Sequence, residues 1–311
     1  MNNIDVYVYG MTVLSTIHLL KGKFPAPDTY GEIQETYVIP GGEAANAAIV
    51  LSNLGARVSL DGCYLGEQTE QPLLKYLNAR NVDCSPMIRQ AGFEGWRDIV
   101  FCDGEQRTVF GWFVANLFGG RRLWTIPSEA SIQAARCIAL DPFFGKESDL
   151  VAELCEKHHK DYVTIDCRHD SAIARRARAS VCSQEFLDRE YPNRDYRQLL
   201  NTYRETCQGL VIFTFGSREI RYAAPHTPLQ SSFTPFPVAV RDTLGAGDTF
   251  RAGVVYGVLQ DMPDDETIRF AAACAAVACT RFPSVYQAPS MQEVIALMNS
   301  RATRPPAGPS A

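Results

Sequence analysis

The sequence predicts an α/β fold in which a central, mostly parallel sheet is flanked by helices. Short β-branched segments alternate with longer helical segments along most of the 311 residues, which is typical of βαβ units. The segment 209–216 (GLVIFTFG) is apolar through its centre, as expected for a strand that is covered on both faces. A chain of this length can form one large domain, and we expect residues 1–300 to do so.

Each predicted strand is rich in β-branched and aromatic residues and lies between turn signals. The predicted strands cover residues 4–10, 58–65, 136–141, 161–166, 209–216 and 236–240. The longer segments between them are predicted to be helices, and these cover residues 43–54, 69–79, 128–135, 148–158, 195–206, 247–260, 264–281 and 290–299.

Two segments, 11–39 and 93–116, interrupt this alternation. In the second segment, alternating apolar residues flank Asp103-Gly104, a pair that favours the turn of a β-hairpin. The first segment is polar and contains a further strand candidate at 33–39. We therefore expect the two segments to form a small β-strand flap, or lid, over the main sheet.

The composition argues against several classes of partner and compartment. With 30 Lys and Arg against 35 Asp and Glu, the net charge is −5, whereas nucleic acids and anionic membranes require a basic surface. No apolar stretch reaches the roughly 18–20 residues that span a bilayer, and no signal-peptide pattern is present. The ten cysteines lack C-x-x-C spacing and lie mostly in apolar runs, as in a reducing compartment. We expect a cytoplasmic protein with a disordered tail at 301–311.

The segment most informative about function is 240–259 (VRDTLGAGDTFRAGVVYGVL). A strand is followed by a glycine-rich turn and a helix, so the N–H groups of residues 244–247 lie at a helix N-terminus, where they lack helical partners. The helix dipole favours negative charge there, so the turn can bind a phosphate whose charge grows during transfer. Glycine at 245 and 247 lets the backbone approach the phosphate oxygens closely.

Asp248 follows this turn directly and is placed to accept a proton from an attacking hydroxyl. Positioning and electrostatics dominate phosphoryl transfer, so one carboxylate beside an anion hole can form the minimum catalytic set. The alternative is that Asp248 serves only as an N-terminal helix cap, which is a common role of aspartate.

Two motifs resemble the signatures of one enzyme family. DTLGAGD (242–248) matches the DTxGAGD signature of the ribokinase (PfkB) family of carbohydrate kinases, and PGGEAANAAIVLSNLG (40–55) resembles that family's N-terminal signature. The two motifs keep the family's order and spacing, and the order of strands and helices fits over nearly the whole chain. The resemblance implies a ribokinase-like fold and an ATP-dependent kinase that phosphorylates a hydroxyl of a small sugar or sugar derivative. It also implies ATP and Mg²⁺ as cofactors, and it suggests K⁺.

The resemblance assigns roles to individual positions. It implies that Asp248 is the catalytic base and that Gly245, Ala246 and Gly247 form the anion hole. The positions implied to bind the sugar hydroxyls are Gly41, Gly42 and Asn46. The positions implied to lie near the nucleotide and a monovalent cation are Thr214, Gly216, Ser217, Asp242 and Thr243. For Asn46, an ordinary helix residue is the alternative.

Three positions depart from the family pattern. Ser15 stands where many relatives have an aspartate that binds two sugar hydroxyls. A single hydroxyl cannot make two charge-assisted bonds, so either the substrate differs from ribose or other residues hold it. The N-x-x-E element that helps to organise Mg²⁺ is absent, and Glu185 is the nearest candidate. Phe282-Pro283-Ser284 replaces the usual Gly-Ala pair, so the sequence does not decide whether a potassium site is present.

Three arginines are expected close to the sugar site. Arg97 and Arg107 lie on the flap hairpin, and Arg251 follows the base by three residues. An arginine fork suits a carboxylate or phosphate, which leads to the hypothesis of an anionic substrate such as a sugar acid or sugar phosphate. The alternative is that Arg97 and Arg107 are exposed strand residues and that Arg251 contacts the ATP phosphates.

Two further functions are compatible with the motifs. A nucleoside kinase of the same family could stack a base on Phe93, Trp96, Phe110 or Trp112 of the flap, although these side chains could equally form a buried face or a dimer contact. The edge-exposed hairpin leads us to expect a homodimer through the flap. A non-catalytic sugar or nucleotide sensor could keep the fold without turnover, but it would not need Asp248 beside the anion hole.

Overall fold

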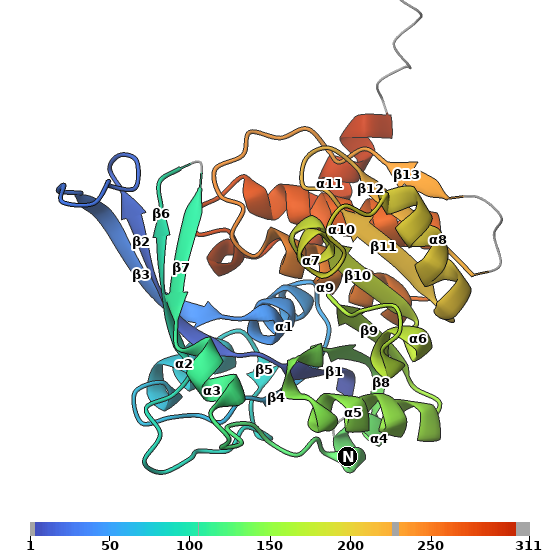
Figure 1. The fold of residues 1–311 in the computed structure, drawn as a ribbon, viewed down its shortest axis with the longest axis horizontal. Coiled ribbons are helices and arrows are strands. Elements are labelled where there is room, and N and C mark those ends of the chain that lie inside the picture. Colours follow the sequence, from blue (N-terminus) through green and yellow to red (C-terminus); the bar gives the residue numbers. More distant parts are fainter. Residues whose placement is uncertain (1–3, 105, 226–229, 303–311) are drawn as a thin grey trace, which may run out of the picture.

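Nine strands form the central sheet in the computed structural model, which describes residues 4–104, 106–225 and 230–302. In spatial order they are β13 Ser231–Phe233, β12 Ile220–Ala223, β11 Leu210–Thr214, β10 Ala179–Ser183, β9 Asp161–Ile165, β8 Ala135–Leu140, β1 Ile4–Gly10, β4 Val58–Gly62 and β5 Val82–Asp83 (Figure 1). Among the described strands of this sheet, only the β11–β12 and β12–β13 pairs are antiparallel. The predicted fold class is therefore confirmed.

Helices cover both faces of this sheet. In β1, Val6 and Val8 pack under one layer of helices, whereas Tyr7 and Tyr9 pack under the other. The first layer contains α1 Glu43–Asn53, α2 Glu70–Asn78, α9 Ala246–Leu259, α10 Asp264–Cys279 and α11 Met291–Ala302. The second contains α4 Glu129–Ala134, α5 Lys146–Lys157, α6 Ala172–Arg176, α7 Gln184–Glu190 and α8 Tyr196–Thr206. Burial on both faces explains why β11 is apolar in every residue before Thr214.

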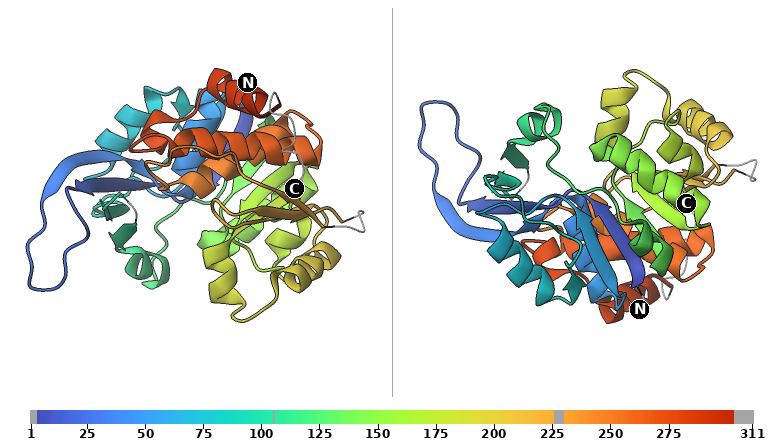
Figure 2. Two further views of the ribbon diagram at one scale, coloured as in Figure 1. Left: turned by 90° about the horizontal axis from the view of Figure 1, so that it is seen from above. Right: turned by 90° about the horizontal axis from the view of Figure 1, so that it is seen from below.

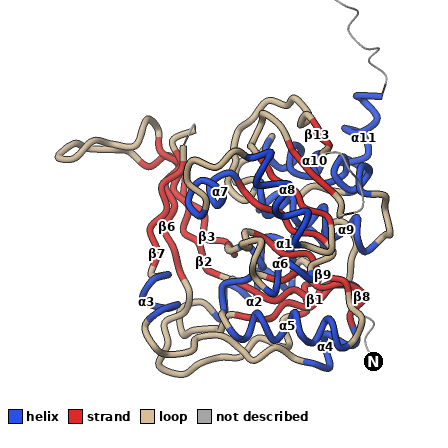
Figure 3. Tube along the Cα trace, turned by 45° about the vertical axis from the view of Figure 1, so that its right-hand side comes forward, coloured by secondary structure: helices blue, strands red, loops and turns tan. Residues whose placement is uncertain are grey.

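A second sheet of four strands stands beside the main one and forms the expected flap (Figure 3). In spatial order its strands are β3 Ile33–Gly41, β2 Val13–Leu20, β6 Arg97–Cys102 and β7 Arg107–Gly111. β2 and β6 pair in parallel, and the connection between β2 and β3 extends away from the body (Figure 2). The predicted hairpin is present, but its connection runs over residues 103–106, of which 105 lies outside the described residues. Ile17 and Val100 of the flap pack with Leu244 of the main domain.

The eight predicted helices are present, with ends close to the predicted ones. The strand predicted at 236–240 is wrong, because that segment is irregular and contains Pro237, which cannot donate a hydrogen bond to a sheet. The strand β10 was missed because Val181 is its only β-branched residue. The strands β2, β5, β12 and β13 and the short helices α3 Phe113–Phe118, α6 and α7 were also not predicted.

The last helix, α11, runs two residues into the tail that was predicted to be disordered from residue 301. α11 extends through Ala302, and residues 303–311 lie outside the described residues. All ten cysteines are free and nine are buried, which confirms their expected role as small core residues. Among the described helices, none combines the length and the apolar character that crossing a membrane requires.

Candidate active site

A cavity of about 480 Å³ lies between the flap and the carboxyl ends of the parallel strands. Its walls come from β2, β3, β6 and β7 of the flap, from the first residues of α1 and α9, and from the ends of β9 and β10. This volume lies in the range of small-molecule sites. The predicted site residues that line it are Ser15, Gly41, Gly42, Asn46, Arg107, Glu185, Thr243, Gly245, Gly247 and Asp248. Folding therefore brings the two motifs together in one site.

The turn before α9 keeps N–H donors available at Gly245 and Gly247, two of the three positions predicted to form an anion hole, whereas the Ala246 N–H is already bonded. Gly245 has a φ of 72°, and a Cβ at this position would collide with the Val285 side chain, so the turn requires glycine. The Ala246 N–H donates to the carbonyl of Thr243 at 3.1 Å. In the described structure, the N–H groups of Gly245 and Gly247 donate to no other backbone group. These two donors, at the positive end of the α9 dipole, are therefore free to bind an anion.

Asp248 and Asn46 meet inside the cavity. The Asn46 amide nitrogen donates to the Asp248 carboxylate at 2.8 Å, and Asn46 itself is buried in the first turns of α1. This contact holds the Asp248 carboxylate in the cavity wall, next to the turn before α9. The alternative role as a helix N-cap does not apply to Asp248, because Gly245 occupies the N-cap position.

Asp242 holds the turn and does not line this cavity. Its carboxylate accepts hydrogen bonds from the Leu244 N–H at 2.9 Å and from the Ser284 N–H at 3.0 Å. Burial raises the pKa of Asp242, and these two N–H groups lower it in part. The carboxylate therefore ties the glycine turn to the segment after α10. The potassium requirement suggested for this region stays a prediction.

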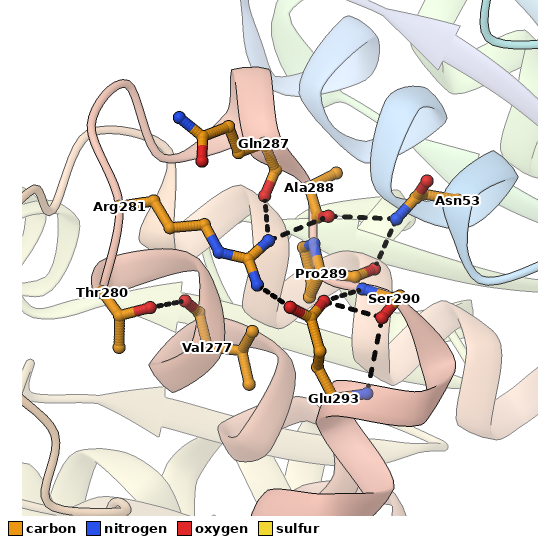
Figure 4. A network of polar contacts seen from close by, with 9 residues as sticks. All are labelled: Asn53, Val277, Thr280, Arg281, Gln287, Ala288, Pro289, Ser290 and Glu293. Carbon is orange, nitrogen blue, oxygen red and sulfur yellow. Dashed lines mark hydrogen bonds and ion pairs between the residues drawn. The ribbon is translucent and has the colours of Figure 1, made fainter.

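A polar network fixes the segment that follows α10 (Figure 4). The Arg281 guanidinium donates to the Gln287 carbonyl at 2.6 Å, and the Asn53 amide of α1 donates to the Ala288 carbonyl at 3.0 Å. The same segment contains Val285, which packs against the turn before α9. The network thus holds in place the segment that contacts the Gly245 turn.

A fully buried ion pair lies below the cavity. Arg251 of α9 pairs with Asp141 at the end of β8, and both side chains have no exposed surface. Arg251 also donates to the Glu43 carbonyl at 2.9 Å, while Asp141 accepts from the Met11 N–H at 2.8 Å. The expectation that Arg251 contacts the acceptor or the ATP phosphates is therefore corrected, because both of its partners are internal. The pair ties α9 to β8, to α1 and to the turn after β1.

The predicted nucleotide loop lies at the same edge of the sheet but outside the cavity. Thr214 ends β11, and Gly216 and Ser217 follow it. Arg218 of this loop donates to Gln184 at the start of α7, which forms part of the cavity wall. In open α/β sheets, nucleotides bind outside the carboxyl ends of the strands, and the loop has that position.

Glu185, the predicted Mg²⁺ candidate, lines the cavity, and so does the carboxylate of Asp166. Glu185 lies in the first turn of α7, and Asp166 follows β9. The Asp166 carboxylate accepts from the Ser183 N–H at 2.7 Å, and burial raises its pKa. Across the described ranges, no group of three or more His, Cys, Asp or Glu side chains is arranged to hold a metal. Two carboxylates still fit Mg²⁺, which keeps several waters and is bound mainly through substrate phosphates.

The flap arginines have different surroundings. Arg107 lines the main cavity. It also lines a second, smaller cavity, together with Thr243. Arg97 contacts Glu94 and is not among the lining residues, so its predicted role in substrate binding is corrected. Successive strand residues point to opposite faces, and in β6 it is Asp98 that faces the cavity.

The flap aromatics do not line the cavity either. Phe93 and Trp96 are buried in the main domain, where the Trp96 indole donates to a backbone carbonyl. Phe110 and Trp112 are half-exposed. The alternative in which a base stacks on these four residues is therefore not supported, whereas the alternative of a buried face holds for Phe93 and Trp96.

Comparison with known proteins agrees with this geometry. The profile of the pfkB family carbohydrate kinases matches residues 3–290. The chain belongs to this family. Its curated relatives include a nucleoside kinase of Methanothermobacter thermautotrophicus (27% identical over 285 residues, covering 87% of this chain and 88% of the relative). They also include the ribokinase of Bacillus subtilis (25% over 276 residues, 84% and 88%).

The fold is similar to that of Arabidopsis thaliana ribokinase complexed with ribose and ATP. The TM-score is 0.79 at 17% sequence identity, and the match covers 95% of this chain and 98% of that chain. As a member of the pfkB family, the protein is an ATP-dependent phosphotransferase that acts on a small sugar or nucleoside.

Three carboxylates of the cavity were missed by sequence reasoning: Glu43, Asp98 and Asp166. Asp166 follows a predicted strand at the edge where ligands bind, so its position could have indicated a role. Glu43 lies within the N-terminal motif, and its pKa is raised to about 8, first by burial and then by Asp248 and Asp141. Asp98 lies in the predicted hairpin, but the sequence does not say which hairpin face is buried.

Proposed function

We propose that this kinase transfers the γ-phosphoryl group of ATP to a hydroxyl of a small sugar or nucleoside, with Asp248 as the base. The observation that carries the proposal is the contact of Asp248 with Asn46, beside the free N–H groups of Gly245 and Gly247. Base, anion hole and acceptor cavity then share one site. This is the arrangement that phosphoryl transfer to a hydroxyl requires.

In the proposed reaction the acceptor oxygen attacks the γ-phosphorus in line. Its O–H bond breaks as Asp248 takes the proton, a new O–P bond forms, and the P–O bond to ADP breaks. The Gly245 and Gly247 N–H groups and the α9 dipole stabilise the charge on the transferred oxygens. Asn46 keeps the Asp248 carboxylate in position throughout.

ATP is proposed to lie along the carboxyl edge, near Thr214, Gly216 and Ser217, with its phosphates toward the α9 turn. Glu185 and Asp166 would hold Mg²⁺ there through water molecules. The ion neutralises charge on the β- and γ-phosphates when it is bound. These placements rest on the shared edge of the sheet and on the two carboxylates that line the cavity.

The flap is proposed to exclude water from the reacting groups. Its cavity face carries the apolar side chains of Ile17, Val100 and Val109. Closing such a surface over the acceptor prevents hydrolysis of ATP and strengthens the electrostatic interactions in the site.

A neutral sugar is the first candidate for the acceptor. A nucleoside is the second, because one curated relative is a nucleoside kinase and because Phe113, Phe143 and Phe186 line the cavity. An anionic acceptor has less support, since Arg107 is the one flap arginine found to line the cavity in the described residues.

The proposal is tested by measuring ADP release from ATP and Mg²⁺ across a panel of neutral sugars, sugar acids, sugar phosphates and nucleosides. Asp248→Asn should lower turnover by about 10²-fold or more, because general-base catalysis contributes at least that much. ATP affinity and thermal stability should stay close to wild type. The matched control is Asp149→Asn, the same change at an exposed residue in the first turn of α5.

An unchanged rate in Asp248→Asn contradicts the assignment of the base. Absence of turnover on every panel member, with ATP still bound, would support the sensor alternative over an active kinase.

A further inference from the structure

Asp98 is a buried carboxylate that faces the cavity without a full set of partners. It lies in β6 directly beside Ser15 of β2, and the two residues are paired in register. Both side chains line the cavity, with exposed fractions of 8% for Asp98 and 4% for Ser15. Within the described structure, the Asp98 Oδ1 atom has no hydrogen-bond partner. A buried, unpartnered acceptor aimed into a ligand cavity indicates that a ligand supplies the missing donor.

The surroundings of Asp98 disfavour its charge when the site is empty. Burial raises its pKa to about 6, and interaction with the Ser15 hydroxyl lowers it only in part. At neutral pH the carboxyl is still mostly ionised and can therefore only accept hydrogen bonds. Burying such a group is unfavourable unless donors are present, and the hydroxyl groups of an acceptor are suitable donors.

We propose that Asp98 and Ser15 together bind the hydroxyl groups of the acceptor. The proposal rests on the proposed kinase function and specifies the substrate class: a neutral compound with neighbouring hydroxyls. The sequence suggested that the carboxylate of this subsite was lost with Ser15 in β2. In the fold, the adjacent strand β6 places a carboxylate at the same rung of the flap sheet.

The distribution of charge along the flap supports a neutral acceptor. Arg107 pairs with Cys102, four residues along β6 from Asp98, which corresponds to roughly 13 Å of strand. Arg107 shares its second cavity with Thr243 and is therefore on the side of the α9 turn, where the phosphates are proposed to lie. An anionic group of the acceptor placed beside Asp98 would be repelled, whereas hydroxyl donors would be bound.

Equilibrium binding without ATP tests this proposal independently of turnover. Isothermal titration calorimetry would compare the affinities of wild type and Asp98→Asn for D-ribose, D-fructose, adenosine and D-gluconate. For the neutral compound that wild type binds best, Asp98→Asn should weaken affinity about 10- to 100-fold, as expected for loss of hydrogen bonds to a charged group. The matched control is Arg97→Gln, the neighbouring position on the opposite face, which should change affinity less than about twofold.

The 2-deoxy and 3-deoxy analogues of that compound identify the contact. Wild type should bind at least one of them about tenfold more weakly than the parent, and Asp98→Asn should discriminate much less. Equal discrimination by both proteins overturns the proposal, as does an affinity of Asp98→Asn within about threefold of wild type. Preference for D-gluconate over all neutral compounds also overturns it.

Thermal unfolding separates binding from folding. The folded pKa of Asp98 lies above that of an unfolded aspartate, so its contribution to stability is present at low pH and lost as pH rises through about 6. The amide introduced by Asp98→Asn does not ionise, so the variant keeps this contribution to stability at high pH. Asp98→Asn should therefore be more stable than wild type at pH 8 and similar at pH 4. Binding that depends on Asp98 without substrate-dependent ADP release leaves this inference standing and rejects the kinase proposal. Substrate-dependent ADP release, combined with binding that does not depend on Asp98, supports the kinase proposal and rejects the role of Asp98.

Discussion

Gly247, the second residue of α9, lines the cavity, and a Cβ at its position would meet no other atom within 4 Å. Gly247→Ala should therefore fold, and the better helix propensity of alanine should raise the free energy of unfolding by up to about 1 kcal/mol. The added methyl group would occupy space beside the anion hole and displace the phosphate. Turnover should fall by about tenfold or more, measured by ADP release together with urea denaturation.

Gly245→Ala is the variant to compare with Gly247→Ala, because it changes the other glycine of the same turn. It combines a φ of 72° with a collision against Val285, so it should lower both stability and turnover. A Gly247→Ala variant with wild-type turnover would show that the transferred phosphate does not lie against this part of the turn.

Single residues also show where sequence reasoning succeeds. Asp248, Asn46 and Gly245 belong to contiguous motifs, and their meeting point follows from the parallel order of the strands. Arg97 and Asp98 are adjacent, and only the flap's packing decides which of the two faces the cavity. The partner of Arg251 lies 110 positions away at the end of β8, and no local pattern indicates it.

At the scale of elements, the Arg251–Asp141 pair holds α9 against β8, and the Arg251 contact with Glu43 holds it against α1. Removing one partner leaves an uncompensated buried charge. Arg251→Met should therefore reduce the free energy of unfolding by about 3–5 kcal/mol in urea denaturation. The matched control is Lys157→Met, which breaks the exposed Lys157–Glu129 pair and should leave the free energy of unfolding nearly unchanged.

The double variant Arg251→Met, Asp141→Leu distinguishes charge from packing. If the uncompensated Asp141 charge causes the loss, the double variant should recover part of the stability. Equal stability of the single variants at positions 251 and 157 would contradict a structural role of the buried pair.

The elements were predictable to different degrees for physical reasons. The sequence pattern of apolar residues predicts long helices such as α9 and α10 and the strand β11. Tertiary packing favours the same secondary structure in these segments, so the predictions hold. β10 is short and consists mostly of small residues, so its strand character comes from its parallel neighbours β9 and β11. The segment 236–240 has the apolar residues of a strand, but Pro237 prevents regular pairing.

At the scale of the whole molecule, the outer face of the flap exposes apolar side chains to solvent. Val38 and Phe110 lie on the face opposite the cavity, since their paired neighbours Thr16 and Ile99 alternate with the cavity-facing residues. Val38 is 54% exposed and Phe110 51%, and β7 is an edge strand. Exposed apolar faces on edge strands are typical of protein contacts.

We therefore expect two copies of the chain to associate through the outer faces of their flaps. Sedimentation velocity at micromolar concentration should show a dimer, and Phe110→Lys should give a monomer, because it places a charge in the apolar contact. The control is Phe118→Lys, which changes an exposed phenylalanine of α3 outside the flap sheet and should leave the dimer intact. A monomeric wild type, or a dimer that persists in Phe110→Lys, contradicts this arrangement. If the dimer forms as expected, each flap is braced by its partner, and its closure over the acceptor depends on both chains.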